Sequence, residues 1–204
     1  MGDRADMVRD RGRLFAAAAA AALALGCGGR DTGPSDALHD DGVGSICEEV
    51  PCRPGTRVIV PLGRGQHVET TVRRSPYVER GEVSILPGET ILVELDFDGG
   101  EIGTPRYVPE ASLPDRTLRL SLGVDDPPSG LPRTLLRVQN DLDRAVSYEA
   151  GAMSAEEWRL VAVSTCPVGA GSVAFEVWPF PALEARLRSF RLVDPEEPLP
   201  EGCE

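Results

Sequence analysis

The chain contains no lysine and only two histidines, so two of the side chains that most often serve as catalytic bases or nucleophiles are absent or scarce. Without lysine there can be no Schiff base, no serine–lysine dyad and no lysine of a phosphate-binding loop. A serine or cysteine nucleophile needs a base beside it, but His39 lies in an acidic, glycine-rich stretch and His67 in a run typical of a strand surface. We therefore predict a protein that is not an enzyme and that holds no cofactor and no metal ion.

Long apolar runs are also absent. A helix that crosses a membrane needs about 20 apolar residues, whereas the longest run here, residues 14–25, has twelve. This run follows an arginine-rich start, a combination that is typical of a secretory signal peptide. It ends in Ala24, Leu25, Gly26 and Cys27, which resemble the lipobox of bacterial lipoprotein signal peptides, with Ala24 and Leu25 exchanged relative to the usual order.

The resemblance implies that residues 1–26 are a lipoprotein signal peptide and that cleavage leaves Cys27 as the first residue, with its thiol acylated. In such lipoproteins an aspartate after the cysteine often retains the protein in the inner membrane. Gly28 stands there instead, which implies the outer membrane, facing the periplasm. Two or more acyl chains, palmitate among them, would anchor the protein stably. The alternative is a plain secretory signal that is cleaved elsewhere.

The cysteine count supports the same interpretation. Five cysteines leave one unpaired in an exported protein, whereas acylation of Cys27 leaves four that can all pair. Disulfides persist in the oxidising compartment that export implies. We predict that Cys47 pairs with Cys52 and Cys166 with Cys203. A four-cysteine zinc site is the alternative, but such sites usually place their thiolates in two close pairs.

Residues 27–45 are rich in glycine, aspartate and serine and have almost no large apolar side chain, which predicts a lipidated, flexible linker. The net charge of −12 would repel phosphates and anionic lipids. We therefore expect no nucleic-acid partner. Contact with the membrane should come from the N-terminal acyl chains alone.

Residues 46–204 consist of short runs with apolar residues at alternate positions, separated by proline and glycine. Nine or ten such runs at regular spacing predict an antiparallel β-sandwich. The stretches "LPGETILVELDF" and "LRVQNDLDRAVSYEA" resemble immunoglobulin-like domains of bacterial surface proteins. We thus predict an all-β, antiparallel immunoglobulin-like β-sandwich. One short piece, "ALEARL" at residues 182–187, has the spacing of a helical turn.

Aromatic residues make up only 5% of the chain, yet Phe175, Trp178 and Phe180 lie within six positions, with Pro179 and Pro181 between and after them. This cluster could be a hydrophobic plug at one end of the sandwich. It could also be a contact surface, because tryptophan and phenylalanine are common anchors of interfaces. Trp178 and Phe180 are the candidate contact residues, and of the two we expect Trp178 to be structural and Phe180 to be more exposed.

Two functions remain. The first is a lipid-anchored envelope protein that acts as a non-catalytic binding or scaffold module for a protein or glycan partner. The second is an envelope hydrolase that uses paired carboxylates, because acidic residues are abundant. Two buried carboxylates with raised pKa values would favour the hydrolase.

Overall fold

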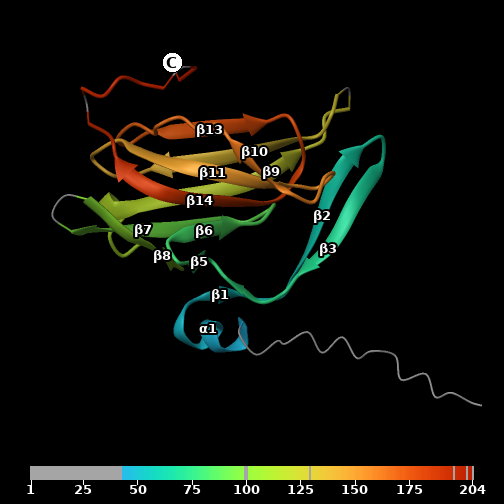
Figure 1. Ribbon diagram of the computed structural model, residues 1–204, viewed down its shortest axis with the longest axis horizontal. Helices are drawn as coiled ribbons and strands as arrows, with labels where there is room; N and C mark the ends of the chain where they lie inside the picture. The colour runs from blue at the N-terminus through green and yellow to red at the C-terminus, as the bar shows by residue number, and fades with distance from the viewer. Residues whose placement is uncertain (1–42, 99–100, 129, 195, 201, 204) are drawn as a thin grey trace, which may run out of the picture. The chain divides into compact units, whose positions relative to one another are not determined.

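Figure 1 shows the computed structural model, which describes residues 43–98, 101–128, 130–194, 196–200 and 202–203. The predicted signal peptide, Cys27 and most of the predicted linker lie outside these residues. All described residues belong to one compact unit. Among them, no helix has both the length and the apolar character needed to span a membrane.

Two five-stranded antiparallel sheets form the body of the protein (Figure 1). The first sheet consists, in spatial order, of β13 (Val173–Trp178), β10 (Arg133–Asn140), β9 (Thr117–Asp125), β7 (Thr90–Asp98) and β8 (Glu101–Val108). The second consists of β12 (Leu160–Val163), β11 (Val146–Ser154), β14 (Ala182–Leu192), β6 (Glu82–Ile85) and β5 (Val78–Glu79). The predicted all-β sandwich is confirmed.

The core lies between the sheets because alternate residues of each strand point inward. Ile91, Leu120 and Val138 illustrate this, since they are neighbours across β7, β9 and β10 and all three are buried. Each of these side chains contributes roughly 1.5–3 kcal/mol by leaving water. The alternation of apolar and polar residues therefore accounts for most of the sandwich.

A smaller set of elements lies beside the sandwich. The hairpin of β2 (Thr56–Gly63) and β3 (Gln66–Val72) forms a separate two-stranded sheet, as does the short pair β1 (Cys52–Arg53) and β4 (Ser75–Pro76). Val58 and Val60 of β2 pack in a second cluster with Leu86, Ala155 and Leu183. Helix α1 (Val43–Glu49) includes the last three positions of the predicted linker, and a 3-10 helix, η1 (Pro114–Arg116), precedes β9.

The predicted helical turn at residues 182–187 is wrong, because this segment is the start of strand β14. Leu183 and Leu187 have the spacing of one helix face. However, Glu184, Arg186 and Arg188 alternate with buried residues at a period of two, which is the period of a strand. β14 pairs with β11 on one side and with β6 on the other, so it is a central strand of the second sheet.

Both predicted disulfides are present. Cys47–Cys52 joins α1 to β1, and Cys166–Cys203 joins the segment after β12 to the C-terminal tail, residues 193–203. The zinc alternative is therefore excluded, since all four thiols are used. In the chain-entropy description, closing a loop of 37 residues stabilises the fold by about 4 kcal/mol, and the shorter loop contributes about half as much.

Arg53 fixes the segment after α1 to the sandwich. Its buried guanidinium donates to the Ser84 carbonyl of β6 and lies 3.3 Å from the Glu89 carboxylate. It also lies 4.8 Å from the centre of the Tyr77 ring, which stacks on Tyr107 of β8 at 3.9 Å. Arg53 and Tyr77 together thus connect the segment after α1 to β6 of the second sheet and β8 of the first.

Candidate functional site

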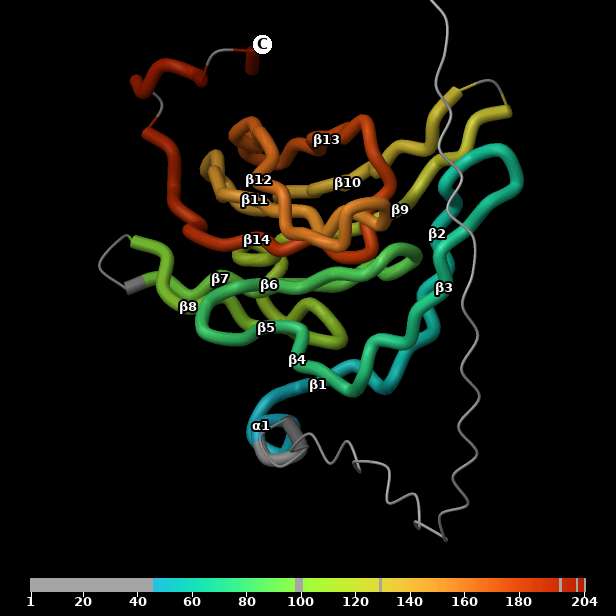
Figure 2. Tube along the Cα trace, turned by 45° about the vertical axis from the view of Figure 1, so that its right-hand side comes forward, coloured from blue at the N-terminus to red at the C-terminus, as the bar shows by residue number. Residues whose placement is uncertain are grey.

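The structure brings the predicted contact residues and one predicted disulfide to a single hollow. Figure 2 shows β12 and β13, the edge strands of their two sheets, at the same margin of the sandwich. A hollow of about 690 Å³ lies between the end of β13, the segment after β12 and the C-terminal tail. Trp178, Phe180 and both Cys166 and Cys203 line it. We call it the edge hollow.

Trp178 and Phe180 differ in burial. Trp178 is only 4% exposed and belongs to the main core, where its indole Nε1 has no hydrogen-bond partner among the described residues. Phe180 is half-buried and packs against the same core from the rim. Trp178 therefore forms the floor of the edge hollow, and Phe180 is the more exposed of the two.

Sequence reasoning placed Phe175 in the aromatic cluster but did not choose it as a contact residue, and it missed the exposed valines on either side of it. Val173, Phe175 and Val177 of β13 all point to solvent, and Phe175 is 59% exposed. Ala174, Glu176 and Trp178 point inward instead. The alternation of apolar residues could find the strand. It could not show which side of the strand faces the core, because the side that turns inward carries a glutamate, Glu176.

Basic and apolar side chains of the neighbouring strands lie beside the exposed row of Val173, Phe175 and Val177. On the outer face of the first sheet, Leu135 is the cross-strand neighbour of Val177, and Arg137 is the neighbour of Phe175. Arg119 lies one strand further, on β9, and neither arginine forms an ion pair within the described residues. The β13 face, as we name it, consists of Arg119, Leu135, Arg137, Val173, Phe175 and Val177.

The outer face of the second sheet has a different character. Arg186 lies 3.3 Å from Glu82 and 3.1 Å from Glu184, and Arg188 lies 3.1 Å from Glu149. These opposite charges neutralise one another, within β14 in the Arg186–Glu184 pair and between neighbouring strands in the other two. The β13 face thus stands out as an apolar and positively charged surface on a protein with a net charge of −12.

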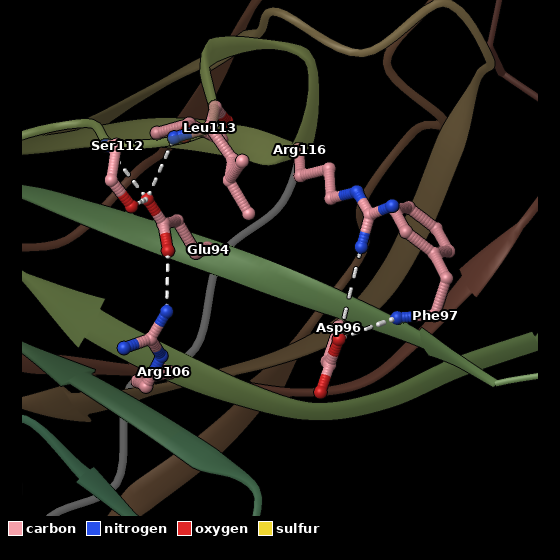
Figure 3. A network of polar contacts seen from close by, with 8 residues as sticks. Glu94, Asp96, Phe97, Arg106, Ser112, Leu113 and Arg116 are labelled. Atoms are coloured by element: carbon pink, nitrogen blue, oxygen red, sulfur yellow. Dashed lines mark hydrogen bonds and ion pairs between the residues drawn. The ribbon is translucent and has the colours of Figure 1, made fainter.

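The buried carboxylate of Glu94 has a structural role. Its side chain is 3% exposed, and Oε1 accepts hydrogen bonds from the Ser112 amide at 2.8 Å and hydroxyl at 2.7 Å and from the Leu113 amide at 3.1 Å (Figure 3). Oε2 accepts from Arg106 at 2.7 Å. The Ser112 hydrogen bonds, with smaller contributions from Leu113 and Arg106, lower the pKa of Glu94. Glu94 thus holds the connection between β8 and β9 as an ionised anchor.

A general acid would need the opposite environment, because burial without hydrogen bonds raises the pKa of a carboxyl group. Among the described residues, Glu94 is the one buried carboxylate, and its pKa is lowered. Nearby Asp96 is exposed and faces Arg116 at 3.9 Å (Figure 3). The described carboxylates therefore lend no support to the hydrolase alternative.

No match to this chain is found among protein families, curated proteins or solved structures. The residues of the site must therefore be interpreted from their geometry. In the described part of the chain, no three histidine, cysteine, aspartate or glutamate side chains gather in a way that could hold a metal ion. The edge hollow and the β13 face together form an apolar contact surface with charged side chains at its margin.

Proposed function

We propose that this protein is a lipid-anchored envelope protein whose sandwich acts as a non-catalytic binding or scaffold module, with the β13 face and the edge hollow as its contact site. The observation that carries the proposal is the row of exposed apolar side chains on β13, namely Val173, Phe175 and Val177. Exposed apolar side chains that lie next to one another are typical of interaction sites, whereas isolated ones are common on any surface.

The energetics of this row suit a partner that covers it. Burying one large apolar side chain contributes roughly 1.5–3 kcal/mol, and aromatic residues at the centre of an interface contribute most of its binding energy. Phe175 lies at the centre of the row, with Val173 and Val177 on either side. The row is also rigid, because β13 pairs with β10 along its whole length.

Photo-crosslinking in intact envelopes tests the contact site. Amine-reactive reagents are unsuitable, because the chain has no lysine. We expect p-benzoylphenylalanine in place of Phe175 to form a discrete adduct with a partner. The matched control places the same group at Leu160, which is exposed on β12 of the second sheet. Absence of any adduct from position 175, or the same adducts from both positions, would contradict the proposal.

The anchor is tested separately. Because the proposal assigns the acyl chains to Cys27, Cys27→Ser is expected to release the protein into the soluble periplasm or to leave an uncleaved precursor. Membrane fractionation together with the mass of the intact protein distinguishes these forms. If the variant stayed with the membranes at the normal mature mass, the lipid anchor would be refuted.

A further inference from the structure

Strand β13 has an unpaired edge. It is the last strand of the first sheet and pairs only with β10. Among the described residues, none of its backbone groups on the other side takes part in a backbone hydrogen bond. Such an edge is a template for another extended segment, and native proteins usually block it with charges, proline or a bulge. Residues 173–177 contain one charge, on Glu176, and no proline.

The side chains of β13 define what a neighbouring strand would need. On the outer side, Val173, Phe175 and Val177 would lie beside every second residue of the added strand, where apolar partners are favourable. On the inner side, Glu176 lines the edge hollow. Its Oε1 accepts a hydrogen bond from the Cys166 amide at 2.8 Å, whereas Oε2 accepts none among the described residues. A basic residue on the inner side of the added strand would complement this free oxygen.

The C-terminal tail limits how bulky the occupant can be. The Cys166–Cys203 disulfide and Pro200 form the opposite wall of the edge hollow. A second copy of the protein that paired through β13 would bring its own sandwich and C-terminal tail to this margin, where the first copy's tail already lies. A second copy is therefore a bulkier occupant than the tail favours. A single extended segment needs only the spacing of one strand, about 4.8 Å.

We infer that the edge hollow is a strand-addition site, which receives an extended peptide segment of a partner protein along the free edge of β13. The segment carries apolar residues at alternate positions on the outer side and a basic residue opposite Glu176. This inference rests on the proposed function in that β13 is the contact element, and it selects a protein over a glycan as the partner. Glu176 on the inner side selects the basic residue, whereas the arginines of the β13 face lie on β10 and β9, on the other side of β13 from the added strand.

A capped heptapeptide, Thr-Val-Lys-Val-Thr-Val-Thr, serves as the probe. The full-length protein in detergent carries Trp158→Phe, which leaves Trp178 at the edge hollow as its only tryptophan. We expect a saturable change of Trp178 emission, and Phe175→Ala should weaken binding at least tenfold. Glu176→Gln keeps an acceptor for the Cys166 amide and should weaken binding about fivefold for this peptide, but not for one with threonine in place of lysine.

Backbone methylation provides the decisive control, because only alternate N–H groups of an added strand point to its neighbour. One version of the peptide is methylated on the backbone nitrogens of its odd positions, and a second version on those of its even positions. One of the two should lose binding and the other should retain it. No saturable change up to about 1 mM peptide, equal binding of both methylated peptides, or a stable dimer in analytical ultracentrifugation would overturn the inference. The crosslinking result at position 175 does not depend on these outcomes. The proposed contact site and the proposed strand addition can therefore be refuted independently of each other.

Discussion

Trp178→Ala is expected to lower the free energy of unfolding by about 3–5 kcal/mol, a large share of the roughly 5–15 kcal/mol that stabilises a typical domain. The indole is 4% exposed and belongs to the main core. Its removal would leave a cavity between the end of β13 and the second sheet, because surrounding strands relax only partly around a deleted ring. Urea denaturation followed by circular dichroism measures the effect without relying on tryptophan emission.

Phe175→Ala is the matched control, since it removes an aromatic ring three positions away in the same strand. Phe175 is 59% exposed, so its truncation should change the free energy of unfolding by less than about 1 kcal/mol. Equal destabilisation by the two changes would mean that the Phe175 ring is buried in solution. It would also remove the β13 face as a contact site.

Asn140→Ala is expected to cost about 3 kcal/mol of folding stability, although it deletes only an amide group. Asn140 is fully buried at the end of β10. The two N–H groups of its Nδ2 are shared among the carbonyls of Arg144 at 2.8 Å and of Val168 and Gly169 at 3.0 Å, and its Oδ1 accepts from the Leu142 amide at 3.0 Å. Alanine would leave the Leu142 amide and the Arg144 carbonyl without these partners, whereas the Val168 and Gly169 carbonyls still accept from the Val146 and Ser172 amides. Each buried group that loses its partner costs about 1–3 kcal/mol.

This side chain matters because it joins two connections that cross between the sheets. One runs from β10 to β11 and the other from β12 to β13. Asn140→Asp should be destabilised at neutral pH as well, since a carboxylate accepts hydrogen bonds but cannot donate to the three carbonyls. Gln139→Ala is the control, because Gln139 is only half-buried and hydrogen-bonds to side chains near the surface. Similar urea midpoints for Asn140→Ala and Gln139→Ala would contradict this account.

The sequence was most informative where a local pattern carried a physical constraint. Spacing and number of the cysteines were enough to predict both disulfides, which the structure contains. Alternation of apolar residues was enough to predict the two-sheet sandwich. Glu94 shows the limit, because the groups that bind it come from residues 106, 112 and 113, and no spacing in the sequence indicates that they converge on one carboxylate.

What the sequence determined by itself is which residues share a face, and what the tertiary structure decided is which face turns inward. A period of two assigns Val173, Phe175 and Val177 to one side of β13 and Glu176 and Trp178 to the other, but it is silent on which side meets the core. In the folded protein the inward side carries Trp178, which packs in the core, and Glu176, which accepts a hydrogen bond from the Cys166 amide. The apolar row is left exposed because the space between the two sheets is already filled from that other side.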